Sequence, residues 1–131
     1  MFKNKKLVVR LVGSALVSSA VTFGAIGVAR ALEVPRGTVA SPDIYKIIAQ
    51  SDKYVVIEAT WKPGQRDEFH SSPGGGAYFL TTCRMMRHSP NGLTWSFTDP
   101  AGAAFVIPPV ASVSVENVSD SECKMLLFQE K

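Results

Sequence analysis

His70 and Ser72 are the residues with the clearest capacity for chemistry in this sequence. An imidazole titrates near neutral pH, so His70 could act as a general base or hydrogen-bond a ligand. A base also needs a substrate within reach and usually a partner that orients it. The alternative role for His70 is structural, as an inward-facing histidine hydrogen-bonded to Ser72 or to a backbone carbonyl.

Asp67 and Glu68 precede this histidine and could be mistaken for part of a metal-binding cluster. Adjacent residues of a strand point to opposite faces, so the two carboxylates cannot both share a cavity with His70. We therefore expect Asp67 and Glu68 to be a solvated charge pair in a loop. His88 lies beside a tight-turn sequence and is expected at the exposed end of a strand.

Four aromatic residues could build a platform for a ligand. They are Trp61, Trp95, Phe97 and Phe105. Aromatic side chains at strand positions usually bury their large apolar area in the core, so we expect core packing for these four.

The two cysteines, Cys83 and Cys123, have two alternative states. In an oxidising compartment they can form a disulfide that closes a long loop of chain. Otherwise they pack as two small buried apolar side chains.

The first 31 residues have the pattern of a secretory signal segment. Basic residues without any acid precede an uncharged, largely apolar run at positions 11–29. The small residues of Ala29-Arg30-Ala31 place the expected cut after Ala31, which predicts an exported protein, periplasmic or secreted. Uncleaved, the run is long enough to anchor the chain in a bilayer about 30 Å thick.

The positive charge of the chain belongs to this segment. The full sequence has 14 basic and 11 acidic residues, a net charge of +3. Removing residues 1–31 leaves nine basic and 11 acidic residues, a net charge of −2. The sequence therefore gives no support for a nucleic-acid partner.

The elements that must position His70 are short strands. Residues 54–61 alternate between apolar and other side chains, which is typical of a half-buried strand. Further strands are expected near Phe69 and at residues 77–88, 93–98, 104–107, 110–118 and 123–129. The turn Ser89-Pro90-Asn91-Gly92 should pair residues 77–88 with 93–98. Short strands without intervening helices predict a sandwich or barrel.

One short helix is expected before the strands. Residues 32–40 indicate an extended lead-in, and Ser41-Pro42-Asp43 then has the residues of a helix start. Ile44, Ile47 and Ile48 follow at helical spacing and should pack on the barrel.

Two stretches resemble the paired motifs of the cupin superfamily. The first, residues 63–80, contains Pro63-Gly64 and His70, and the second, residues 100–117, contains Ile107-Pro108-Pro109. The resemblance implies an all-β fold, the double-stranded β-helix or jelly-roll barrel. The predicted organisation is a signal peptide at 1–31, a lead-in and short helix at 32–53, and the barrel domain at 54–131.

The same resemblance implies a metal site from which most ligands are missing. In the family, the first motif supplies two histidines one residue apart and then a carboxylate, and the second supplies a third histidine. Here only His70 matches; Ser72 and Val113 stand at the other histidine positions, and residues 74–77 contain no acid. Transition metals usually need three or four protein ligands, so we expect no metal, no cofactor and no catalytic residue.

The cavity expected in place of the metal site is mostly apolar. Its predicted lining residues are His70, Ser72, Phe79, Val113, Val115 and Asn117. The leading interpretation is a metal-free, exported module that binds a small organic ligand or has a structural role, as a homodimer in the latter case. The alternative is a metal-dependent cupin enzyme of the dioxygenase, isomerase or lyase type, with Glu116 or Glu58 joining His70 as ligands.

Overall fold

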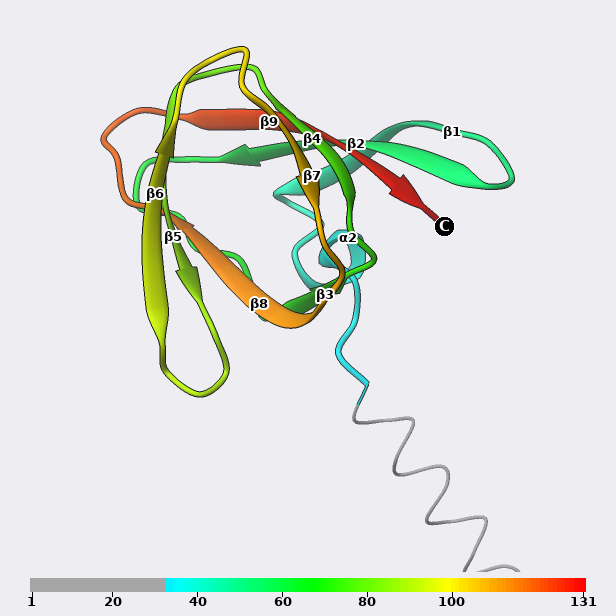
Figure 1. The fold of residues 1–131 in the computed structure, drawn as a ribbon, viewed down its shortest axis with the longest axis horizontal. Coiled ribbons are helices and arrows are strands. Elements are labelled where there is room, and N and C mark those ends of the chain that lie inside the picture. The colour runs from blue at the N-terminus through cyan, green and yellow to red at the C-terminus, as the bar shows by residue number, and fades with distance from the viewer. Residues whose placement is uncertain (1–32) are drawn as a thin grey trace, which may run out of the picture. The chain divides into compact units, whose positions relative to one another are not determined.

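The alternating segment at residues 54–61 forms a strand with the predicted bounds, β2 (Tyr54–Trp61), and buries every second side chain. The computed structural model describes residues 33–131, in which nine strands form two antiparallel sheets and α2 (Gly37–Ala40) is the single helix (Figure 1). The predicted all-β class with one short helix is confirmed. The predicted signal segment, 1–31, lies outside the described residues. No helix within residues 33–131 is long and apolar enough to cross a membrane.

The two sheets enclose the core between them. The larger sheet has the strand order β1-β2-β9-β4-β7, and the smaller has the order β3-β8-β5-β6. The strands other than β2 are β1 (Tyr45–Gln50), β3 (His70–Ser72), β4 (Gly75–Phe79), β5 (Cys83–His88), β6 (Thr94–Asp99), β7 (Ala104–Ile107), β8 (Val110–Asn117) and β9 (Cys123–Glu130).

The single strand predicted at residues 77–88 is wrong, because the chain turns a corner within it. β4 pairs with β7 and β9 in the larger sheet, whereas β5 pairs with β6 and β8 in the smaller one. At the corner, the N–H groups of Leu80 and Thr81 donate to the Lys124 carbonyl, at 2.9 and 3.3 Å. The predicted pairing across the 89–92 turn holds for β5 and β6 only.

The helix predicted from Ser41 onward is also wrong, and the segment forms the edge strand β1. The Ser41 hydroxyl, the expected helix cap, instead accepts from the Glu68 N–H at 2.9 Å. β-branched isoleucines favour extended backbone, and pairing with β2 satisfies the main chain there. The pairing register shifts between Ile47 and Ala49, and Ile48 is 54% exposed. The helix, α2, lies where an extended lead-in was expected.

A disulfide joins the two sheets. Cys83 begins β5 in the smaller sheet, and Cys123 begins β9 in the larger one. The bond between them confirms the first of the two states that the sequence left open. Both cysteines are fully buried within the core cluster.

Gly75 is required where β4 meets β9. Its φ is 131°, which L side chains rarely adopt, and a Cβ built there would lie 2.0 Å from the Phe128 carbonyl oxygen. Only glycine lets the two backbones approach this closely.

Candidate functional site

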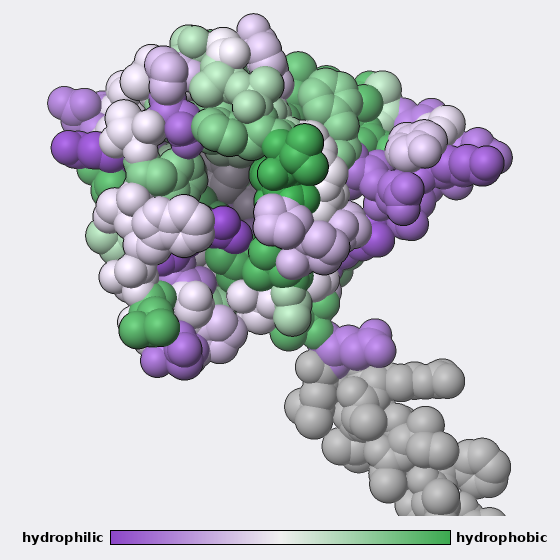
Figure 2. All heavy atoms as spheres, viewed as in Figure 1, coloured by the Kyte–Doolittle hydropathy of each residue, from purple (hydrophilic) through white to green (hydrophobic). Residues whose placement is uncertain are grey.

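A cavity of about 380 Å³ lies between the two sheets, and both contribute to its wall. Figure 2 shows the hollow opening on the face viewed, with hydrophobic residues along much of its rim. Its apolar lining includes Tyr45, Ile57, Trp61, Ala77, Phe79, Trp95, Phe97, Phe105, Val106, Ile107, Val110, Val113, Val115, Met125 and Leu127. Voids in protein cores are normally little larger than a water molecule, so the volume of this cavity is too large for a packing defect.

Five of the six predicted pocket residues line this cavity. They are His70, Ser72, Phe79, Val113 and Val115. Asn117 is not among the lining residues, although β8 turns it to the same side of the strand. Its buried amide donates to the carbonyls of Trp61 and Ser121, at 3.2 and 2.8 Å. Asn117 therefore closes the turn that follows β8 and has no place in the site.

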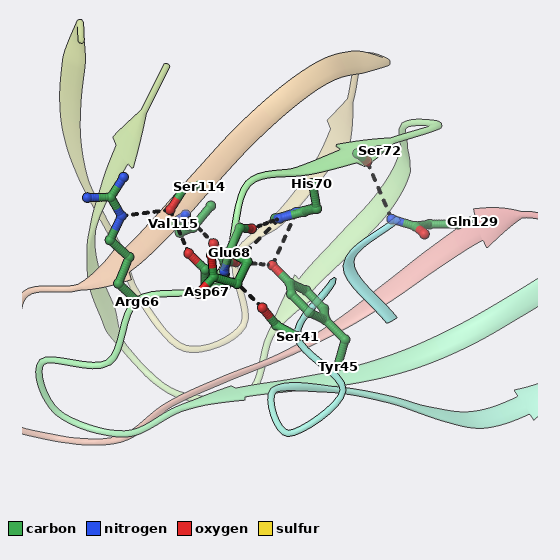
Figure 3. A network of polar contacts seen from close by, with 10 residues as sticks. All are labelled: Ser41, Tyr45, Arg66, Asp67, Glu68, His70, Ser72, Ser114, Val115 and Gln129. Atoms are coloured by element: carbon green, nitrogen blue, oxygen red, sulfur yellow. Dashed lines mark hydrogen bonds and ion pairs between the residues drawn. The ribbon is translucent and has the colours of Figure 1, made fainter. Parts of the chain in front are cut away.

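His70 is fixed at one end of the cavity, on β3 directly opposite Val113. Its Nδ1 lies 3.0 Å from the Glu68 carbonyl oxygen, which can only accept, so Nδ1 carries the proton in the neutral ring. This contact is the backbone-carbonyl arrangement considered from the sequence. Nε2 then holds a lone pair and lies 3.4 Å from the Tyr45 hydroxyl (Figure 3). Nε2 of the His70 imidazole can therefore accept a hydrogen bond.

Asp67 does not form the solvated charge pair that we expected, because it is only 4% exposed. The chain before β3 pairs with β8, since Asp67 N–H donates to the Val115 carbonyl at 3.0 Å. This pairing turns the carboxylate inward, where Oδ2 accepts from the Tyr45 hydroxyl at 2.5 Å and Oδ1 from Val115 N–H at 2.6 Å. Glu68, its neighbour, is exposed as predicted.

Burial is the largest influence on the pKa values of Asp67 and Tyr45. It raises the pKa of the Asp67 carboxyl, against the opposing effect of the hydrogen bonds from Tyr45 and Val115. Burial also raises the pKa of the Tyr45 hydroxyl well above its usual range, and the neighbouring Asp67 charge adds to this. Tyr45 therefore stays protonated, and its hydroxyl donates its hydrogen bond to Asp67, which leaves His70 Nε2 without that donor.

Gly37 allows Tyr45 and His70 to pack this closely. A Cβ at position 37 would lie 3.0 Å from ring carbons of Tyr45 and 3.3 Å from His70 Cδ2. The two rings lie 5.1 Å apart between centres. α2 thus covers the His70 end of the site with its one residue that lacks a side chain.

Arg87 lines the cavity from β5 and was not among the residues predicted from the sequence. Its guanidinium lies 5.2 Å from the centre of the Trp95 ring. The signal was the period of two along β5, which places Arg87 on the same face as the buried Cys83 and Met85. Even as the single strand expected at 77–88, the alternation places Arg87 on the face of Phe79, so the sequence carried this signal.

The four aromatic residues divide between core and rim. All of them line the cavity, and Trp61 is buried as predicted. Trp95 is 62% exposed, and Phe105 is also exposed, so core packing is wrong for these two. Their position at the opening is that of the aromatic platform considered as the alternative.

The metal centre implied by the cupin motifs does not fit these residues. Val113 stands opposite His70, and the Nδ1 of that histidine is already hydrogen-bonded to Glu68. No group of three His, Cys, Asp or Glu residues within positions 33–131 is arranged to hold a metal ion. A single imidazole nitrogen falls short of the three or four ligands such a site needs.

The two glutamates proposed as substitute ligands are engaged elsewhere. Glu116 Oε1 lies 2.9 Å from His88 Nε2, which makes His88 partly buried instead of exposed. Glu58 forms an ion pair with Lys124 at 3.6 Å. Neither glutamate lines the cavity.

Solved structures of other proteins share this fold. No protein-family model and no curated protein matches the sequence. A cupin domain from Bordetella pertussis Tohama I superimposes with a TM-score of 0.61 at 19% identity, over 76% of this chain and 98% of that one. A double-stranded β-helix protein from Klebsiella pneumoniae gives a TM-score of 0.52 at 18% identity, over 66% and 75% of the two chains.

A polyketide cyclase from Streptomyces resistomycificus is also similar, with a TM-score of 0.51 at 18% identity, over 66% of this chain and 63% of that one. Likenesses at these identities show the fold and not the activity. The chain therefore has the cupin fold, the double-stranded β-helix that its two motifs predicted.

Proposed function

We propose that this protein is an exported, metal-free binding module that takes a small, mostly apolar organic molecule into its barrel. The observation that carries the proposal is the cavity itself. Its volume of about 380 Å³ lies within the range of small-molecule sites, roughly 300–1,000 Å³. Such sites combine an apolar wall with a few polar groups that orient the ligand.

The polar groups that would orient the ligand are three side chains of the cavity lining. His70 offers Nε2 as an acceptor, since its other nitrogen is held by Glu68. Ser72 and Gln129 lie beside it, with Gln129 Nε2 and Ser72 Oγ 3.5 Å apart (Figure 3). This set suits recognition of one hydroxyl or amide donor on the ligand, and it leaves the remaining wall to apolar contact.

Export is supported by the disulfide and by the signal-like N-terminal sequence. The Cys83–Cys123 bond links two buried cysteines. Disulfides persist in oxidising compartments and are rare in reducing ones. Intact mass of the protein recovered from the cell tests this part, because cleavage after Ala31 removes a defined mass.

Ligand binding is tested with 2-naphthamide, a neutral aromatic probe, by isothermal titration calorimetry. Val113 is buried and lines the cavity, so Val113→Phe fills the space that the probe would occupy. Val39 is 72% exposed and lies outside the lining, so Val39→Phe is the matched control.

We expect saturable binding to the wild type and to Val39→Phe, with at least about tenfold weaker binding to Val113→Phe. Absence of saturable binding to the wild type would overturn the proposal. Equal binding to all three proteins would also overturn it, because the probe would then lie outside the cavity.

A further inference from the structure

Arg87 brings a positive charge to the cavity wall of the smaller sheet. It stands directly opposite Val115 on β8 and opposite Trp95 on β6. Opposite residues of antiparallel strands point to the same face, and both of these neighbours line the cavity. The guanidinium carbon lies over the Trp95 ring, 5.2 Å from its centre, within the range of a cation–π contact. The N–H edge of the guanidinium stays available for hydrogen bonds.

No acidic side chain within residues 33–131 forms an ion pair with Arg87. Asp99 is the one acidic residue of that range in the cavity lining, and it stands opposite Cys83. Trp95, the residue opposite Arg87, is four positions from Asp99, which corresponds to roughly 13 Å along the strand. Asp67 is occupied by Tyr45 and by the Val115 N–H.

The second cation of the wall is already engaged. Arg36 lines the cavity, but its Nη1 donates to the Glu130 carbonyl at 2.8 Å. Arg87 has no such bond from its side chain to any residue in the described part of the chain. Its charge does act within the site, since it lowers the pKa of Tyr45 against the effect of burial.

A partly buried cation without a partner is costly unless something supplies the opposite charge. An arginine edge matches a carboxylate with two parallel hydrogen bonds. Trp95, Phe97 and Phe105 add flat apolar surface to the lining of the same cavity. The Phe105 ring also packs edge-on against Phe79, with ring centres 5.9 Å apart.

We propose that the ligand is an apolar, aromatic carboxylic acid whose carboxylate binds the Arg87 guanidinium while its ring system lies against the aromatic wall. This inference rests on the proposed function and specifies the chemical class of its ligand. It also assigns Trp95 a role, because the indole holds the guanidinium in place for the carboxylate.

The test compares two probes of nearly equal shape, 2-naphthoate and 2-naphthamide, which differ in charge. Affinities are measured by calorimetry for the wild type, Arg87→Met and Arg87→Lys. Arg84→Met is the matched control, because Arg84 precedes Arg87 on β5 but is exposed and donates to the Val118 carbonyl. It removes the same charge from the protein without touching the cavity.

We expect the wild type and Arg84→Met to prefer naphthoate by about tenfold or more, as a charge-assisted hydrogen bond would give. Arg87→Met should lose this preference and keep its affinity for naphthamide. Arg87→Lys should retain part of the preference, which controls for a folding defect in the methionine variant.

Two outcomes separate this inference from the proposed function. Equal affinity of the wild type for both probes, or a naphthoate preference that survives in Arg87→Met, overturns the carboxylate assignment and leaves the binding module intact. Failure of both probes to bind the wild type overturns the binding module as well.

Discussion

At the scale of single residues, Asp67 determines how the His70 end of the cavity is organised. Its carboxylate joins the first strand of the larger sheet, through Tyr45, to β8 of the smaller sheet, through Val115. The Ser114 hydroxyl also donates to its backbone carbonyl at 2.7 Å. Burying a carboxyl group requires such partners, because its hydration is lost.

The raised pKa of Asp67 makes stability depend on pH in a defined direction. Between the unfolded value of 3.8 and the higher folded value, the folded protein binds more protons than the unfolded chain. The contribution of Asp67 to the free energy of unfolding therefore increases as pH falls from neutral toward 4. It amounts to about 1.4 kcal/mol for each unit by which the pKa is raised.

Urea unfolding of the wild type and Asp67→Asn at several pH values between 7 and 4 measures this effect. The wild type should gain stability relative to the variant as pH falls, because asparagine does not titrate. Asp52→Asn, at an exposed position, gives the background change. If the free energies of unfolding of the wild type and Asp67→Asn change with pH by the same amount, the raised pKa of Asp67 is contradicted.

Among the elements, the sequence predicted strands well where alternation or flanking prolines mark them, and poorly at β1 and at the corner between β4 and β5. β2 and β7 match the expected ranges, because alternation or flanking prolines mark them. The corner between β4 and β5 carries no glycine or proline and depends on hydrogen bonds to Lys124, which lies 43 residues from Thr81. The residues around the corner therefore do not predict its pairing with Lys124.

The β1 segment illustrates the same limit. Its isoleucine spacing fits a helix, but an edge strand gains pairing with β2 that a local pattern cannot reveal. Asp67 was misplaced for a related reason, since its burial comes from pairing with Val115, 48 residues away.

Gly75 gives a prediction for the β4–β9 contact. Gly75→Ala should destabilise the protein severely, since the new Cβ would collide with the Phe128 carbonyl in addition to its unfavourable φ. Gly64→Ala is the control, because Gly64 also has a positive φ, 74°, but open space around it. It should cost only about 1–2 kcal/mol. Similar losses in thermal unfolding for the two variants would contradict the close contact.

The disulfide gives a second prediction at this scale. Closing a loop with a sequence separation of 40 restricts the unfolded chain by about 4 kcal/mol. The double variant Cys83→Ala/Cys123→Ala should lose approximately this free energy of unfolding, and the reduced wild type should behave alike. A loss below about 1 kcal/mol in both would show that the bond adds little to the packing of the two sheets.

For the molecule as a whole, the fold and the lining of the candidate site were predictable to different degrees. Two spaced motifs sufficed for the cupin fold, because turns and alternation repeat along the chain. Five of six expected pocket residues line the cavity, since strand alternation decides which side chains face inward. Tyr45 was missed because its position depends on the edge strand β1, whereas Arg87 follows the same alternation as Phe79 and was overlooked. Self-association as a homodimer stays a prediction, tested by concentration-dependent sedimentation.

We propose an organic ligand site in the barrel at the place where the family motifs imply a metal. Elemental analysis of the wild type and His70→Ala, both purified without chelators, distinguishes the two kinds of site. We predict far less than one equivalent of any transition metal in both proteins, because the cavity offers one free imidazole nitrogen. About one equivalent in the wild type that disappears in His70→Ala would contradict the claim.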